Sequence, residues 1–84
     1  MKARVYVFYK DSVFDPQGNT LSLSLQRMGF NQVQDVRVGK VIDVTLKAYA
    51  QEDARRDLQK MCDKLLANPV IESFRYEILD ENQK

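Results

Sequence analysis

The feature that most constrains this fold is the strand expected over residues 3–10. Its side chains alternate between two sides of the strand: Ala3, Val5, Val7 and Tyr9 on one, and Arg4, Tyr6, Phe8 and Lys10 on the other. Large apolar groups therefore stand on both sides. A strand of this kind is typical of the centre of a sheet that is covered on both faces. The fold must cover one face of this sheet, and we expect the cover of the other face to come from elsewhere.

A helix is expected to begin at Asp15-Pro16, because aspartate caps exposed backbone N–H groups and proline suits the first helical position. Three apolar residues then recur at helical spacing: Leu21, Leu25 and Met28. Gly29 suits the C-terminal cap of this helix. The pattern therefore predicts an amphipathic helix that follows the first strand.

Alternation returns on either side of Gly39-Lys40. Its apolar members are Val36 and Val38 before this pair, and Ile42, Val44 and Leu46 after it. The pattern predicts a hairpin of two strands with a two-residue turn at Gly39-Lys40.

A second helix is expected from about Glu52 to Ala67, with acids in its first turn and lysines towards its end, as the helix dipole favours. Its predicted buried stripe comprises Ala54, Leu58, Met61, Cys62, Leu65 and Leu66. Asn68-Pro69 ends the helix, because proline cannot continue it. Residues 71–79 then alternate as a last strand.

The resulting order is β-α-β-β-α-β in a single domain over residues 1–84. This is the α+β, ferredoxin-like split arrangement, in which two helices cover one face of a four-stranded antiparallel sheet. An apolar side of the first strand is then left uncovered. We therefore expect a homodimer or a pair of dimers that associates through the sheet. The candidate interface residues are Val5, Tyr6, Val7 and Phe8.

The charge balance argues against nucleic acid or an anionic membrane as a partner. The chain has 13 lysines and arginines against 12 acids, a net charge of +1. Its apolar runs are far shorter than the roughly 20 residues that span a bilayer. The N-terminal sequence goes directly into strand-like alternation without an apolar signal region, so we expect a cytoplasmic protein.

Groups suited to catalysis are scarce. The chain has no histidine and one cysteine, which excludes zinc sites of the Cys/His type. Gly18, Gly29 and Gly39 are scattered and form no phosphate-binding motif. Cys62 falls on the apolar stripe and is expected to be a core thiol. We therefore predict no catalytic residue, no metal site and no cofactor in this chain.

Two polar clusters remain. Asp15-Pro16-Gln17-Gly18 reads as a helix cap and turn, but a better helix former than Gln17-Gly18 would serve a cap alone. Arg37, Gly39 and Lys40 are either a hairpin turn with solvated charges or a rigid grip for a carboxylate, a phosphate or an acidic surface. Both interpretations stay open at this point.

These segments resemble the PurS family, the small subunit of phosphoribosylformylglycinamidine synthase. The resemblance lies in residues 13–18, Gly29-Phe30, residues 35–40 and residues 62–72, in the same order and spacing, and covers essentially the whole chain. Phe14 replaces a more usual leucine. The resemblance implies a cytoplasmic complex that converts formylglycinamide ribonucleotide to its amidine with ATP and glutamine-derived ammonia.

In that family a large synthetase subunit uses ATP and magnesium, and a glutamine amidotransferase subunit releases ammonia. The resemblance implies that a dimer of the small subunit joins the two and assists ammonia transfer. The contact candidates for the larger partners are Asp15, Pro16, Gln17, Gly18, Arg37, Gly39, Lys40 and Asn68. A ferredoxin-like regulatory module that binds a small molecule is the alternative, and a stand-alone enzyme such as an acylphosphatase lacks a suitable phosphate loop.

Overall fold

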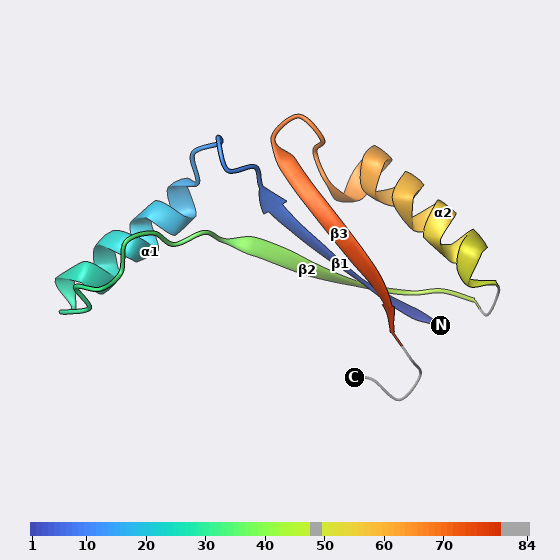
Figure 1. Cartoon of the computed structure of the whole chain (residues 1–84), viewed down its shortest axis with the longest axis horizontal. Coiled ribbons are helices and arrows are strands. Elements are labelled where there is room, and N and C mark those ends of the chain that lie inside the picture. The colour runs from blue at the N-terminus through green and yellow to red at the C-terminus, as the bar shows by residue number, and fades with distance from the viewer. Residues whose placement is uncertain (48–49, 80–84) are drawn as a thin grey trace.

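The computed structural model describes residues 1–47 and 50–79. The elements follow in the order β1 (Lys2–Tyr9), α1 (Pro16–Arg27), β2 (Gly39–Thr45), α2 (Gln51–Met61), a π-helical turn η1 (Cys62–Leu66) and β3 (Glu72–Leu79). This is an α+β protein with two main helices and an antiparallel sheet, as the sequence predicts (Figure 1).

The sheet has the strand order β2-β1-β3, and β1 is antiparallel to both neighbours. In its register Val5 lies opposite Ile42 on β2 and Tyr76 on β3. The prediction that the first strand is central is therefore confirmed. It is central because its alternate residues can be buried while both edges of the strand are hydrogen-bonded.

The predicted fourth strand and its hairpin are wrong. Within the described ranges the sheet has three strands, and residues 33–38 belong to none of them. Gly39 and Lys40 do not form a turn, because they begin β2 and pair with Phe8 and Val7. The backbone N–H of Val38 donates to the Asp15 carboxylate instead of to a neighbouring strand.

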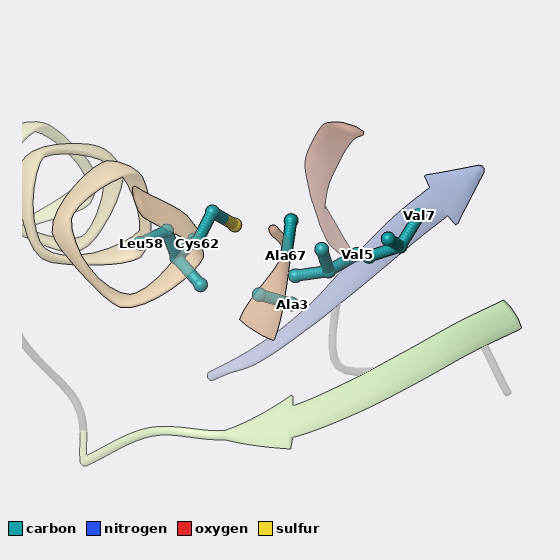
Figure 2. Close-up of a cluster of buried hydrophobic side chains, with 6 residues drawn as sticks. All are labelled: Ala3, Val5, Val7, Leu58, Cys62 and Ala67. Atoms are coloured by element: carbon teal, nitrogen blue, oxygen red, sulfur yellow. The ribbon is translucent and has the colours of Figure 1, made fainter. Parts of the chain in front are cut away.

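The hydrophobic core lies between α2 and one face of β1. Figure 2 shows Ala3, Val5 and Val7 on β1 directed towards Leu58, Cys62 and Ala67. Leu58 and Cys62 are completely buried, in agreement with the predicted stripe, and burial raises the pKa of the Cys62 thiol. Leu65 is 83% exposed, against the prediction. The stripe is interrupted because the helix widens at η1, where Ala67 N–H donates to the Cys62 carbonyl five residues earlier.

Helix α1 does not cover the sheet. Figure 1 shows it beyond the end of the strands, while α2 alone packs against the sheet, so the prediction of two helices on one face is wrong. The molecule measures 50 × 31 × 14 Å and its radius of gyration is 16.3 Å. A compact domain of this length has a radius of gyration of about 12 Å. Helix α1 and residues 33–38 therefore form an arm, the name used below for residues 16–38.

The open face of the sheet is more polar than expected. Arg4 forms a salt bridge with Asp43 at 2.8 Å, and the Tyr6 hydroxyl donates to Glu77 at 2.8 Å. The Arg75 guanidinium lies 4.0 Å from the centre of the Tyr6 ring. Of the four candidate dimer residues, Val5 and Val7 are covered by α2, whereas Tyr6 and Phe8 lie on the open face. Association through this face stays a prediction.

Candidate functional site

Asp15 joins the two polar clusters that the sequence singled out. Its Oδ1 accepts from the Gly18 N–H at 2.9 Å, which is the predicted N-terminal cap of α1, where Pro16 is the first helical residue. Its Oδ2 accepts from the Val38 N–H at 2.7 Å. One buried carboxylate therefore fastens the start of α1 to the residue that precedes β2.

Gly18 allows the chain to pass close to α1. A Cβ atom at this position would overlap the Val36 carbonyl oxygen and lie 2.9 Å from Asp15 Oδ2. A side chain at position 18 would therefore require the backbone at Val36 to move, which is energetically costly. This answers the question that the sequence left open, because the glycine serves close packing between α1 and residues 36–38 rather than the helix itself.

Arg37 holds the other side of the same junction. Its Nη2 donates to the Lys10 carbonyl at 3.0 Å and to the Val13 carbonyl at 2.9 Å. The guanidinium thereby closes the loop between β1 and α1, so part of its donor capacity is used within the chain. We name Asp15, Gly18, Arg37 and Val38 together the latch, because they fix the arm relative to the sheet.

The electrostatics of the latch favour an ionised Asp15. The hydrogen bonds from the Val38 and Gly18 N–H groups, aided by the nearby Arg37 charge, hold the pKa of Asp15 below its ordinary value. A lowered pKa means that ionised Asp15 stabilises the folded state above its ordinary pKa of about 3.9. That stabilisation is lost as the pH falls through the lower pKa of the folded protein.

We expect Asp15→Asn to lower the melting temperature by several degrees at pH 7, because an amide is a weaker acceptor and carries no charge. The variant should also lose part of the acid-induced destabilisation that the unmodified protein shows below about pH 4. Thermal unfolding followed by circular dichroism at pH 7 and pH 3 measures both effects. Asp11→Asn, at an exposed aspartate of the same loop, is the control. Equal pH dependence in the two variants would contradict the role of Asp15.

A cavity of about 180 Å³ lies beside the latch, at the end of β1. It is lined by Val7, Phe8, Tyr9, Gln17, Val38, Gly39, Lys40 and Glu72. The structure thus brings the candidates Gln17, Gly39 and Lys40 together around one opening. Asn68 is not among these lining residues; it lies in the turn before β3, where its Oδ1 accepts from the Val70 N–H. Its backbone N–H donates to Glu72 at 2.7 Å.

Glu72 was missed as a site residue by sequence reasoning. The family resemblance extends to this position, but no local pattern marks it, because it reads as an ordinary residue near the start of the strand expected over residues 71–79. Its place at the cavity follows from the pairing of Tyr9 with Glu72, which joins residues that are distant in the chain.

A second and larger cavity, of about 380 Å³, lies between β2, the end of α2 and η1. Its lining comprises Val44, Lys60, Met61, Lys64, Leu65 and Leu66. Apart from the two lysines these side chains are apolar, so the cavity offers surface for packing rather than for chemistry.

Over residues 1–47 and 50–79, no three or more cysteine, aspartate or glutamate side chains cluster in a way that could hold a metal ion. In the same ranges, no helix combines the length and the apolar character that crossing a membrane requires. The latch and the cavity beside it present backbone, amide and charged groups.

Comparison with known proteins matches residues 2–80 to the PurS family model, described as phosphoribosylformylglycinamidine (FGAM) synthase. The PurS subunit of Bacillus subtilis strain 168 is 48% identical over 81 residues, which cover 92% of this chain and 90% of that protein. The subunit of Synechocystis is 45% identical over 75 residues, covering 89% of this chain and 75% of that protein.

Solved structures agree. A B. subtilis PurS structure aligns with a TM-score of 0.85 and 46% identity, covering 94% of this chain and 98% of that one. A chain from the structure of PurLQS from Thermotoga maritima aligns with a TM-score of 0.83 and 33% identity, covering 93% and 95%. From these matches along nearly its whole length, the chain belongs to the PurS family of phosphoribosylformylglycinamidine synthase.

Proposed function

We propose that the chain is a non-catalytic assembly subunit of phosphoribosylformylglycinamidine synthase in purine biosynthesis. In this role it joins the ATP- and magnesium-dependent synthetase subunit to the glutamine amidotransferase subunit in the cytoplasm and assists ammonia transfer between them. The similarity to a chain of the PurLQS structure supports membership of such a complex. The observation that carries the proposal is the arm, which is tied by the latch and yet packs against little of its own sheet.

The arm presents apolar surface that a folded monomer leaves in water. Met28 is 71% exposed and Leu21 is 46% exposed, on the stripe that the sequence predicts to be buried. Phe30, which follows the helix, is 49% exposed. Apolar side chains gathered on one projecting helix are typical of a surface that another molecule covers.

The cavity that Val44, Met61 and Leu66 line is apolar, as the exposed surface of the arm is. In the split arrangement a second helix would pack beside α2 on the same face of the sheet. Here α1 does not occupy that position, and Val44, Met61 and Leu66 line the space beside α2. We infer that the arm of a second copy fills the space, so that two chains exchange arms in a homodimer. This inference puts the dimer contact on the α2 side of the sheet, as an alternative to the open face, which carries Phe8 and Val41 besides its charged groups.

Such a dimer is better suited to assembly than to turnover. Arm exchange would leave the open faces of the two sheets available, with the charged groups Arg4, Asp43, Arg75 and Glu77 on each. Charged and aromatic groups at fixed positions are suited to recognising larger protein partners.

Native mass spectrometry of the isolated protein is expected to give a dimer or a pair of dimers. Met28→Asp should shift the population to monomer. Because Met28 is exposed in the monomer, its replacement should destabilise the monomer little, whereas burying a carboxylate in the exchanged contact is strongly unfavourable. Leu23→Asp is the matched control, since Leu23 lies on the other side of α1 and is 44% exposed. A dimer that withstands Met28→Asp but not Leu23→Asp would contradict arm exchange.

The same measurement tests the proposed bridging role. Mixed with the synthetase and amidotransferase subunits, glutamine and nucleotide, the unmodified protein should appear in one complex with both. A mixture in which the two large subunits associate equally well without this chain would overturn the proposal. The Leu23→Asp protein should still enter the complex.

A further inference from the structure

The cavity beside the latch contains side chains of opposite charge on the same face of the sheet. Lys40 lies opposite Val7, and Glu72 lies opposite Tyr9. Val7 and Tyr9 are two residues apart on β1, so all four side chains project to one side. Lys40 and Glu72 therefore flank the central strand from its two neighbours. Two strand spacings across the sheet and two residues along it put their backbones roughly 12 Å apart.

Several polar atoms at this cavity have no described hydrogen-bond partner and can bind a ligand. Glu72 Oε1 accepts from the Asn68 N–H at 2.7 Å, and no partner is described for Oε2. Among residues 1–47 and 50–79, neither the Lys40 ammonium nor the Gln17 side-chain amide has a described hydrogen bond or ion pair. A cavity with a cation, an anion and an amide at its wall is therefore open to a ligand that pairs with all three.

The charges limit the class of ligand. A phosphate or other simple anion would be attracted by Lys40 but repelled by Glu72, and a simple cation would meet the reverse. A dipolar molecule without net charge is favoured at both ends. The volume of about 180 Å³ suits a molecule of amino-acid size and is small for a nucleotide.

We propose that this cavity binds a free α-amino acid as its zwitterion. The Lys40 ammonium pairs with the ligand carboxylate, and Glu72 Oε2 accepts from the ligand ammonium group. The Gln17 amide, at the start of α1, faces the ligand side chain and favours one with a complementary amide. Because the Val38-Gly39 backbone also lines the cavity, the ligand contacts the segment that the latch ties to the arm. The site is separate from the subunit-joining role proposed above.

The test is a titration of the ¹⁵N-labelled protein with L-glutamine, followed by backbone amide shifts in two-dimensional NMR. Saturable shifts are expected at Tyr9, Val38, Gly39, Lys40 and Glu72. N-acetyl-L-glutamine, which lacks the ammonium group, and L-glutaminamide, which lacks the carboxylate, should each bind about tenfold more weakly or worse.

Lys40→Gln and Glu72→Gln should each weaken L-glutamine binding by about tenfold or more. Lys47→Gln, at an exposed lysine beyond the end of β2, is the control and should bind as the unmodified protein does. The absence of shifts up to about 10 mM ligand, shifts confined to other residues, or equal binding of the two analogues would each overturn the proposal. The analogues decide the question even if a substitution impairs folding. Failure here would leave the dimer and complex masses unchanged, so it is distinguishable from failure of the assembly role.

Discussion

Leu58→Ala is expected to destabilise the protein by about 2–5 kcal/mol, the largest effect of any single truncation proposed for this chain. Leu58 is completely buried and lies where α2 meets Val5 and Cys62 in the core cluster. In so small a core, few neighbouring side chains can rearrange to fill the cavity that the substitution leaves. Since domains of this size are marginally stable, such a loss removes a large share of the total free energy of unfolding.

Urea unfolding monitored by circular dichroism measures this change, at one fixed protein concentration because association of the subunits adds to apparent stability. Arg55→Ala is the control, since Arg55 is exposed on the outer side of the same helix and alanine keeps its helical propensity. That variant should unfold within about 0.5 kcal/mol of the unmodified protein. Comparable losses in the two variants would show that α2 is not held by the described core.

Gly18→Ala is expected to break the latch. The added methyl group would overlap the Val36 carbonyl oxygen, so either α1 or residues 36–38 must move, at a cost of about 1–3 kcal/mol. Movement of either segment would lengthen the hydrogen bond between the Val38 N–H and Asp15 Oδ2. The position of the arm would then be lost even though the sheet and α2 stay folded.

Two readouts separate this outcome from general unfolding. The amide resonances of residues 36–38 should shift or broaden while those of β1 and β3 keep their positions, and the dimer should dissociate at a higher protein concentration. Asn19→Ala, at the next and exposed residue of α1, introduces the same alanine without the overlap and should leave both readouts unchanged. An unchanged dimer in Gly18→Ala would show that the close approach of α1 to Val36 does not position the arm.

The elements that could be predicted from the sequence are those governed by near neighbours in the chain. The cap at Asp15, the left-handed Gly29 after α1 and the central position of β1 all agree with the structure. Each depends on one residue type or on an alternation over a few residues, and local sterics and hydrogen bonding decide it.

The hairpin at Gly39-Lys40 was wrong because glycine there has another cause. A Cβ atom on Gly39 would lie 2.7 Å from the Val7 carbonyl oxygen, so this glycine permits close strand pairing rather than a turn. Only the pairing of β1 with β2 reveals that contact. The exposure of Leu65 was missed for a similar reason, since no helical periodicity anticipates the wider turn at η1.

The candidate site shows the same division. Asp15, Gln17, Gly18, Arg37 and Lys40 could be chosen from the sequence as members of two clusters that a simple turn did not fully explain, but their roles could not be assigned. Arg37 donates to two loop carbonyls of its own chain, and Glu72 enters the cavity only through its pairing with Tyr9. Local chemistry in the chain was enough for the α+β class, the cap and the scarcity of catalytic groups. The arm, the latch and the two cavities depend on contacts between residues far apart in the chain, and because no local periodicity encodes such contacts, the tertiary structure alone decided them.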